Sequence, residues 1–333
     1  MKASRRLALA LAGAAAAASV TACGGGGGGG DASGSGERTV KISLGVAPAG
    51  AAVSTGIQQG RFREQGLAVE TSSVESPPAR VAAVQSGSVD VVELPTPAFV
   101  NAVGRGLPIH ALAAQYGYPE GVDSDPYESI DVLVAPGSAA HGMGDLAGAT
   151  IAVPARQDLM EILASSEITE AGGDPRSVKW IVLDFQSQVA ALKAGRVDAI
   201  LVPFPFSALA LGDGARSIAR PAGDFFGTAP TTIWAVGERV AQDKDLVQRL
   251  QRGIYASNAY ADASENRTAF VQATAARSGI PVELFEKSGV AFYFPLTLEA
   301  ADLQATADKM NRLGFLEQPV DVTGRVLAPP AAS

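Results

Sequence analysis

The sequence of 333 residues has one cysteine and two histidines, and nothing after residue 23 is apolar for long enough to cross a membrane. A single cysteine excludes a disulfide within the chain, and its position at Cys23 excludes thiolate catalysis and cysteine metal sites from the body that follows. His110 stands in an apolar stretch and His141 in a loop, and we expect both to be packing or loop residues. We therefore expect no catalytic residue, no metal site and no cofactor.

Basic residues are also in deficit, because 26 lysines and arginines stand against 34 acidic residues, for a net charge of −8. Loss of the first 22 residues would remove Lys2, Arg5 and Arg6, three positive charges, and bring the net charge to about −11. An acidic body disfavours nucleic acid and anionic lipid surfaces as partners. Nucleic-acid binding is therefore not expected.

The first 22 residues have the layout of an export signal, with Lys2, Arg5 and Arg6 followed by an apolar run over residues 7–20. The run is shorter than the roughly 20 residues that a spanning helix needs. Its end, VTAC, resembles the bacterial lipobox, which implies that Cys23 becomes the lipid-modified first residue of the mature chain. We expect residues 1–22 to be a signal peptide and the protein to be anchored by lipid on the extracytoplasmic side of the cell membrane, with export by the Sec or the Tat route left open.

Seven glycines follow Cys23, and glycine, serine, alanine and aspartate continue to residue 36. Such a segment buries too little apolar surface to offset its backbone entropy. Residues 23–38 are therefore predicted to be a flexible tether that begins at the lipidated cysteine.

The body contains an internal repeat. Residues 79–97 (ARVAAVQSGSVDVVELPTP) and 187–205 (SQVAALKAGRVDAILVPFP) are identical at eight of nineteen positions without a gap. Each copy reads as a helix end capped by glycine (Gly87 or Gly195), an apolar strand, and a proline that ends the strand. Asp90 and Asp198 open the two strands and are predicted to be turn or cap residues.

Strands and helices alternate in both halves, which predicts an α/β fold of two lobes with mostly parallel sheets and flanking helices. Ligands bind at the carboxyl ends of strands in such sheets. Two facing lobes would bring the loops at residues 47–54, 73–76 and 95–96 against those at 154–157, 185–187 and 204–205. The sequence therefore predicts a cleft that closes on a small molecule.

Several segments resemble one family. IQQGRFREQGLAVE, GSVDVV, GMGDLAGATIAV and GRVDAILVPFP are similar, in order and spacing, to motifs of the NMT1-like family of type II periplasmic solute-binding proteins. Members of that family bind sulfonates, nitrate, taurine or pyrimidine precursors. The resemblance spans residues 40–327 and implies a first lobe of residues 39–125 and 240–333, a second lobe of residues 126–239, and crossovers near 116–133 and 226–236.

The resemblance also implies a monomeric binding protein that delivers a small-molecule ligand to an ABC permease with a cytoplasmic ATPase. The ligand contacts that it implies fall on the following residues: Ala47, Pro48, Ala49, Gly50, Pro95, Thr96, Arg156, Gln157, Phe204 and Pro205. The turn at 155–157 lacks the Gly-Ser-rich sequence of many sulfonate and nitrate binders, which puts simple inorganic anions in doubt.

Residue types suggest a ligand class. Arg156 at a helix start would suit a carboxylate or sulfonate, with neutralisation by Asp158 or Glu161 as the alternative. Four aromatic residues could stack on a planar ligand, with ordinary core or hinge packing as the alternative: Tyr116, Phe185, Phe204 and Phe206. The predicted ligand is a small organic solute, either a monoanion or a heteroaromatic compound.

Two other functions fit the same fold. A pyrimidine-synthase-like enzyme would need an iron site, which two histidines without cysteine do not supply. A receptor that signals to a membrane sensor needs only a closing cleft, so the sequence does not separate it from a transport protein.

Overall fold

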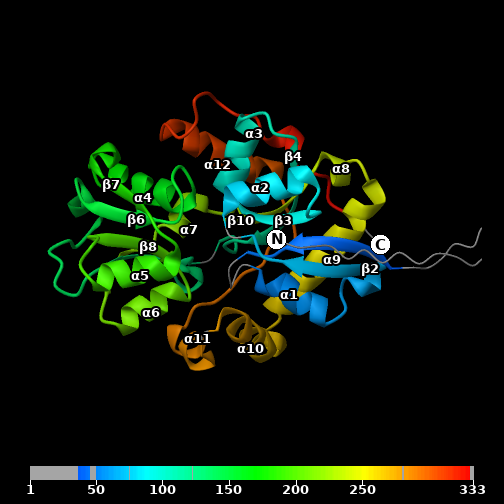
Figure 1. Ribbon diagram of the computed structural model, residues 1–333, viewed down its shortest axis with the longest axis horizontal. Helices are drawn as coiled ribbons and strands as arrows, with labels where there is room; N and C mark the ends of the chain where they lie inside the picture. The colour runs from blue at the N-terminus through cyan, green and yellow to red at the C-terminus, as the bar shows by residue number, and fades with distance from the viewer. Residues whose placement is uncertain (1–36, 46–49, 75, 122, 280, 331–333) are drawn as a thin grey trace, which may run out of the picture. The chain divides into compact units, whose positions relative to one another are not determined.

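The computed structural model describes residues 37–330 apart from 46–49, 75, 122 and 280. Two five-stranded sheets, each flanked by helices, form two lobes, with the first lobe on the right and the second, green, on the left of Figure 1. The first sheet has the order β2-β1-β3-β10-β4 and consists of β1 (Arg38–Ser43), β2 (Leu67–Ser72), β3 (Val91–Pro95), β4 (Ile109–Tyr116) and β10 (Thr232–Gly237). The second has the order β7-β6-β8-β5-β9 and consists of β5 (Ile130–Val134), β6 (Thr150–Val153), β7 (Lys179–Val182), β8 (Ala199–Pro203) and β9 (Arg216–Ala219).

The two sheets have the same internal arrangement. In the first, β1 pairs in parallel with β2 and β3, while β10 runs antiparallel between β3 and β4. In the second, β6 pairs in parallel with β7 and β8, while β5 runs antiparallel between β8 and β9. Four strands of each sheet thus share a direction and one opposes them, which confirms the predicted two-lobed α/β fold.

Twelve helices surround the sheets in the described part of the chain. Those on the first lobe or following it are α1 (Ala51–Gln58), α2 (Pro77–Ser86), α3 (Thr96–Gly104), α8 (Glu238–Ala241), α9 (Lys244–Asp262), α10 (Arg267–Ser278), α11 (Val282–Ser288) and α12 (Ala300–Arg312). Those on the second lobe are α4 (Leu159–Glu170), α5 (Phe185–Lys193), α6 (Phe206–Gly212) and α7 (Ala222–Phe226). Helix α9 packs against α1 and β4, and α12 packs against α3.

The sequence repeat corresponds to a repeat of structure, because α2, β3 and α3 occupy in the first lobe the places of α5, β8 and α6 in the second. Gly87 and Gly195 have φ angles of 73° and 64° and end their helices in the left-handed conformation that glycine favours. Pro95 and Pro203 are the last residues of β3 and β8. The glycines and prolines of the repeat therefore predicted correctly where these helices and strands end.

The chain crosses between the sheets at residues 117–129 and again at 227–231. The predicted second lobe, residues 126–239, includes the segment that forms β10. Hydrogen bonds of β10 to β3 and β4 assign it to the first sheet, so the second boundary lies several residues earlier than expected.

A cluster of aromatic side chains packs where the lobes meet the C-terminal segments. It comprises Tyr116, Phe204, Phe270, Phe285, Phe292 and Phe294. Phe204 and Phe285 meet edge to face with ring centroids 4.7 Å apart, so α11 is fixed against the end of β8.

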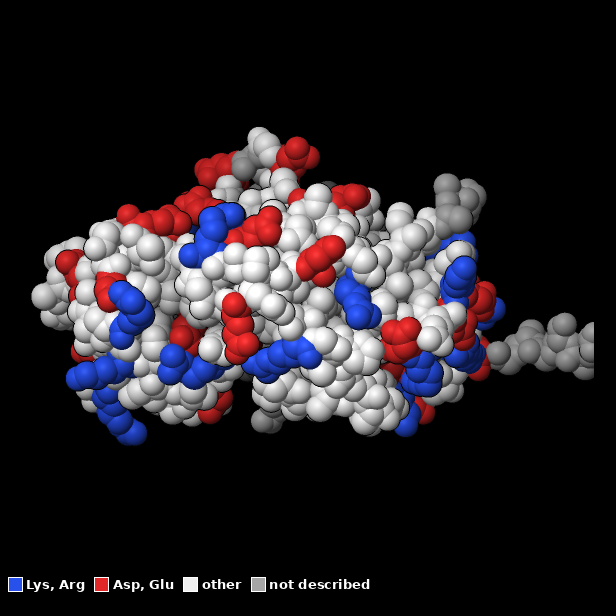
Figure 2. Space-filling model, turned by 90° about the horizontal axis from the view of Figure 1, so that it is seen from above, with Lys and Arg blue, Asp and Glu red and all other residues white. Residues whose placement is uncertain are grey.

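Among the helices of the described residues, none is both long and apolar enough to span a membrane. Acidic and basic side chains are interspersed over the face drawn in Figure 2.

Candidate functional site

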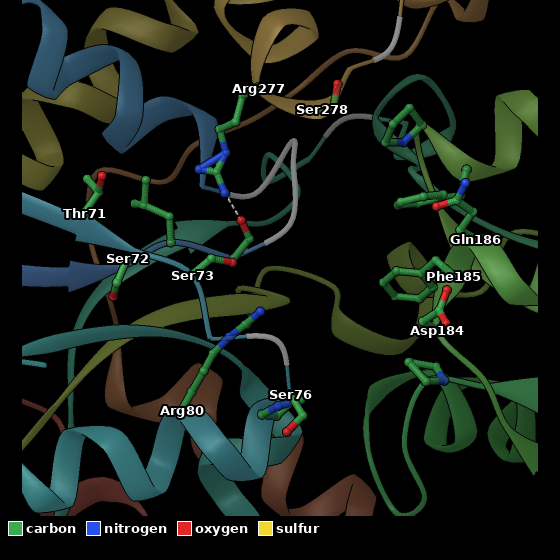
Figure 3. A pocket seen from close by; sticks show the side chains of 16 residues that line it. Thr71, Ser72, Ser73, Ser76, Arg80, Asp184, Phe185, Gln186, Arg277 and Ser278 are labelled. Carbon is green, nitrogen blue, oxygen red and sulfur yellow. Dashed lines mark hydrogen bonds between the residues drawn. The ribbon is translucent and has the colours of Figure 1, made fainter. Parts of the chain in front are cut away.

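A cavity of about 1060 Å³ lies between the two lobes at the carboxyl ends of their strands (Figure 3). Its first-lobe side is lined by Leu44, Gly45, Thr71, Ser72, Ser73, Ser76, Pro77, Arg80, Arg277 and Ser278. Its second-lobe side is lined by Pro154, Asp184, Phe185, Gln186, Pro205 and Phe206. Four of the six loops that were predicted to face the cleft contribute to this lining. The loop at 95–96 and the described residues of the loop at 47–54 do not. We call these two sides the first-lobe wall and the second-lobe wall.

The first-lobe wall contains two guanidinium groups. Arg80 lies in the first turn of α2 and is buried, with its Nε donating to the Val74 carbonyl at 2.7 Å. Its Nη1 donates to the Glu93 carbonyl at 3.2 Å. Because backbone carbonyls hold the group in place, the cation is preorganised at the edge of the cavity.

Arg277 reaches the same wall from the last turn of α10 and donates from Nη2 to the Gly45 carbonyl. Its Nε is buried and has no hydrogen-bond partner among the described residues. Burial lowers the pKa of Arg277, while the nearby Glu93 carboxylate opposes that effect. A buried donor without a partner is costly, so Arg277 has unmet hydrogen-bonding capacity at the wall of the cavity.

The second-lobe wall is mainly apolar. Phe185 and Phe206 contact each other with ring centroids 5.4 Å apart, and two prolines extend the surface. Asp184 caps α5, and its carboxylate accepts the Ser187 N–H at 2.9 Å and the Ser187 hydroxyl at 2.7 Å. These hydrogen bonds lower the pKa of Asp184. Figure 3 shows Asp184, Phe185 and Gln186 facing the polar first-lobe wall across the cavity.

Only some of the predicted ligand residues lie at this cavity. Pro205 lines it, and Gly50, the N-cap of α1, lies against the Arg277 guanidinium. Ala47, Pro48 and Ala49 fall outside the described residues. Two predicted aromatic contacts, Tyr116 and Phe204, are buried in the aromatic cluster, and the Tyr116 hydroxyl donates to the Tyr127 carbonyl at 2.8 Å.

Pro95 and Thr96 support the second crossover and are not among the residues that line the cavity. Pro95 pairs with Thr232 of β10, and the fully buried Thr96 hydroxyl donates to the Pro230 carbonyl at 2.5 Å. The hydrogen-bonding capacity of Thr96 is thus met by the protein itself.

Arg156 and Gln157 line a separate, smaller cavity between α2, α3 and the start of α4. The Arg156 guanidinium contacts both oxygens of Glu161, at 2.8 and 2.9 Å, and lies 5.9 Å from the ring centroid of Trp180. The Glu161 hydrogen bond raises the pKa of Arg156. Gln157, with a φ of 57°, accepts at its carbonyl a hydrogen bond of 2.8 Å from Asn101 in the first lobe. The neutralised arginine that the sequence left as the alternative is the arrangement found here.

Sequence reasoning missed Arg80 and Arg277. A signal for Arg80 was present, because the ungapped repeat places it opposite Gln188, a charged residue against a neutral one. Arg277 comes from the C-terminal part of the chain, and no motif or repeat marks it. In the described part of the chain, no three residues among His, Cys, Asp and Glu lie together in a way that could hold a metal ion.

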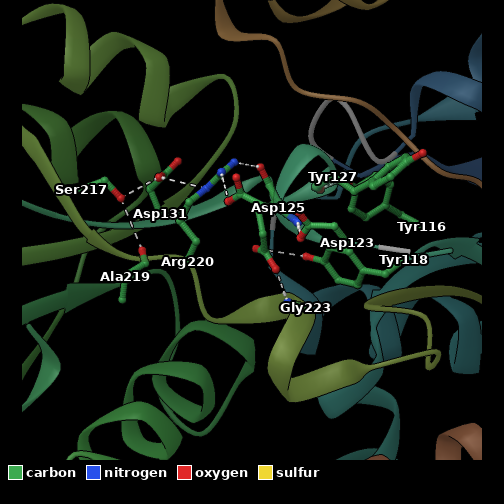
Figure 4. A network of polar contacts seen from close by, with 11 residues as sticks. Tyr116, Tyr118, Asp123, Asp125, Tyr127, Asp131, Ser217, Ala219, Arg220 and Gly223 are labelled. Atoms are coloured by element: carbon green, nitrogen blue, oxygen red, sulfur yellow. Dashed lines mark hydrogen bonds and ion pairs between the residues drawn. The ribbon is translucent and has the colours of Figure 1, made fainter. Parts of the chain in front are cut away.

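A polar network joins the first crossover to the segment just before the second (Figure 4). Glu128 is buried in the first crossover and accepts hydrogen bonds from the Gly223 N–H and, at 3.4 Å, from the Tyr118 hydroxyl. Arg220 donates to Asp125 at 2.7 Å and to the Glu128 carbonyl at 2.5 Å. Burial raises the pKa of Glu128 to about 7 in spite of these partners.

The fold is shared with several solved structures. The alkanesulfonate-binding protein of Xanthomonas axonopodis pv. citri, solved with MOPS bound, has a TM-score of 0.72 at 22% identity, over 87% of this chain and 98% of its own. The periplasmic aliphatic sulphonate-binding protein of Escherichia coli has 0.70 at 17% identity, over 89% and 94%. The periplasmic nitrate-binding protein of Synechocystis PCC 6803 has 0.70 at 13% identity, over 86% and 84%. At these identities the likeness establishes the fold alone.

No curated protein matches the chain in sequence. The sequence profile of the NMT1/THI5-like family does match, over residues 48–268, which is more than half of the chain and includes both copies of the repeat. The chain therefore belongs to the NMT1/THI5-like family.

Proposed function

We propose that this protein is an extracytoplasmic solute-binding protein that captures a small organic anion between its lobes and delivers it to an ABC permease with a cytoplasmic ATPase. The observation that carries the proposal is the contrast between the two walls of the cavity. Arg80 and Arg277 stand among hydroxyl groups on one wall, and Phe185 and Phe206 stand on the other. The family and the neighbouring folds are consistent with a binding protein.

The walls suit different parts of one ligand. A guanidinium presents parallel N–H donors to a carboxylate or sulfonate, and half-burial strengthens that attraction relative to water. The serine and threonine hydroxyls of residues 71–73 and 76 can donate to remaining anion oxygens. The rings and prolines opposite would cover an apolar or planar ligand body.

Binding to both walls at once would hold the lobes together. The chain passes between the sheets at the crossovers 117–129 and 227–231, and rotation about these crossovers can bring the walls closer. A ligand that contacts both walls favours the closed arrangement by its extra contacts there. The closed, loaded protein is the form that would meet the permease.

Calorimetric titration of the protein without residues 1–22 tests the proposal. The panel consists of benzoate, benzenesulfonate and hexanesulfonate, with benzamide, glucose and a neutral dipeptide as uncharged comparisons. At least one anion should bind with a micromolar or lower Kd, and the uncharged compounds should not. Binding of only sugars or peptides would contradict the proposal.

A pair of variants locates the anion. Arg277→Gln should weaken anion binding by roughly tenfold or more, because a charge-assisted hydrogen bond to a half-buried cation is lost. Arg156→Gln is the matched comparison, since Glu161 already holds its guanidinium in the separate cavity. It should leave the Kd unchanged. The opposite ranking of the two variants would move the ligand to the cavity at Arg156.

The proposal includes a lipid anchor at Cys23, which lies outside the described residues. Two acyl chains would anchor the protein stably where one chain would hold it only marginally. Cys23→Ser should move the protein from the membrane to the soluble fraction after cell fractionation, with the ligand Kd unchanged. A membrane-bound Cys23→Ser variant would show that another segment provides the anchor.

A further inference from the structure

Glu93 is a buried carboxylate directly behind the first-lobe wall. It lies in β3, and its Oε2 accepts the Gly45 N–H at 2.8 Å. The carbonyl of the same Gly45 accepts from Arg277, and the carbonyl of Glu93 accepts from Arg80. Arg80, Arg277 and the Glu93 carboxylate are therefore held together through Gly45, which follows β1, and through Glu93 of β3. Burial raises the pKa of Glu93, while the two arginines and the Gly45 N–H favour its ionised form.

The second lobe fills the same positions without charge. The repeat places Gln188 at the position of Arg80 and Leu201 at that of Glu93. Gln188 Nε2 donates to the Leu183 carbonyl at 2.9 Å, as Arg80 Nε donates to the Val74 carbonyl at 2.7 Å. The fold requires a donor at this helix position, and a neutral amide meets that requirement.

The position of Gly45 also differs between the two lobes in a way that fits this comparison. Ile42 pairs with Val91 in the first sheet as Ile151 pairs with Ala199 in the second, so Gly45 corresponds to Pro154. Proline has no N–H, and therefore no acceptor is needed from Leu201. Both sets of three residues are internally consistent, but only the first-lobe set carries charge.

Buried charges cost solvation energy, and a neutral set of similar volume is often as stable or more stable. Since the second lobe folds around the neutral set, the charges in the first lobe are not a requirement of the fold. Their place behind the wall of the cavity points to the ligand.

We propose that Glu93 sets the charge preference of the cavity for its ligand, because its carboxylate offsets part of the positive charge of Arg80 and Arg277 and so favours a singly charged anion over a doubly charged one. The inference rests on the proposed function and adds a residue that determines specificity. Glu93 does not line the cavity, so it acts through Arg80, Arg277 and Gly45 as a positioning residue. Asp158, which interacts electrostatically with Arg80, and Asp184 on the opposite wall remain unchanged in the variants below.

Two matched pairs of anions test the inference: benzoate with phthalate, and benzenesulfonate with benzene-1,3-disulfonate, each measured by calorimetry near pH 8. Glu93→Gln keeps an oxygen that can accept the Gly45 N–H and removes the negative charge. The affinity for the dianion relative to the monoanion should rise about tenfold or more, since one unit of charge changes within several ångströms of the ligand.

The double variant Arg80→Gln/Glu93→Gln separates charge from structure. It removes one positive and one negative charge, so the formal charge of the wall returns to that of the wild type, and it places at position 80 the residue that the second lobe has at 188. The ratio of dianion to monoanion affinity should return to within about threefold of the wild-type ratio, a shift of less than 1 kcal/mol. A structural role of Glu93 would instead leave the double variant further from the wild type than the single one.

The outcomes are distinct. An unchanged ratio in Glu93→Gln, or a double variant that departs further from the wild type, overturns the inference while leaving the proposed function intact. Failure of the wild type to bind any anion of the wider panel contradicts the proposed function itself, and the inference falls with it.

Discussion

A single residue, Gly45, hydrogen-bonds to two charged side chains: Arg277 in the first-lobe wall and Glu93 behind it. Its N–H donates to Glu93 and its carbonyl accepts from Arg277. A Cβ at this position would overlap the Glu93 carboxylate. The space that a side chain would occupy is therefore already filled by the group that organises the wall.

Gly45→Ala should lower the free energy of unfolding by about 1–3 kcal/mol, because the buried carboxylate must move or the strand end must shift. Anion binding should weaken as well, since Arg277 is held by the same residue. Urea denaturation and calorimetry measure the two effects. Gly212→Ala is the control: it lies at the end of α6 with open space around its Cα, so both quantities should stay within error. Wild-type stability and affinity in Gly45→Ala would contradict this account of the strand end.

Arg156 illustrates what single residues could and could not reveal in the sequence. A basic residue between a strand and a helix is a reasonable ligand candidate, but Glu161 lies close enough along α4 to bind its guanidinium first. Arg80 was identifiable in principle, because the repeat contrasts it with Gln188. Arg277 was not, since its approach to Gly45 depends on how α10 packs, which no local pattern encodes.

At the level of elements, the repeat predicted the role of two aspartates as well as the positions of helices and strands. Asp90 Oδ2 accepts the Lys41 N–H at 2.7 Å, and Asp198 Oδ2 accepts the Thr150 N–H at 2.7 Å. Each carboxylate thus joins the start of one strand to its parallel neighbour, in line with the predicted turn or cap role. The turn or cap role was predictable because each aspartate lies in a short motif at the start of a strand. Their partners Lys41 and Thr150 lie 49 and 48 residues away in the sequence, and these contacts were not predicted.

The partners of β5 and β10 could not be predicted in the same way. Both strands are fully buried and mostly apolar, and such a strand fits the interior of either sheet. Their hydrogen bonds join residues that are distant in sequence, such as Ile233 with Leu94. The period of the hydrophobic pattern identifies a strand but does not identify its sheet, so it could not correct the boundary at residue 239 that the family resemblance implied.

At the scale of the whole molecule, the protonation of one carboxyl group, that of Glu128, affects the segments that link the two lobes. Glu128 belongs to the first crossover, and its partner Gly223 lies in α7, just before the second. A side chain on Gly223 would overlap the Glu128 carboxylate, so the two segments are closely fitted. The charge of Glu128 therefore bears on the stability of both connections at once.

The pKa of Glu128 predicts how stability depends on pH. Its pKa is raised from 4.5 to about 7 in the folded protein, mainly by burial. Between these two values the folded protein retains a proton that the unfolded chain has lost. The stabilisation is fully present below pH 4.5, declines as the pH rises to about 7, and is absent above. This group alone should lower the free energy of unfolding by on the order of 3 kcal/mol across that window.

Glu128→Gln isolates that contribution, because the amide stays neutral at every pH while its oxygen can still accept the Gly223 N–H. Other groups with raised pKa values, such as Asp158 at about 6, are present in both proteins and cancel in the comparison. Urea denaturation at pH 5 and pH 8 should show a smaller loss of stability in Glu128→Gln than in the wild type. The variant should also be the more stable of the two at pH 8. An equal loss in both proteins would mean that Glu128 is already ionised in the folded state at pH 5, with Arg220 and the Gly223 N–H outweighing its burial.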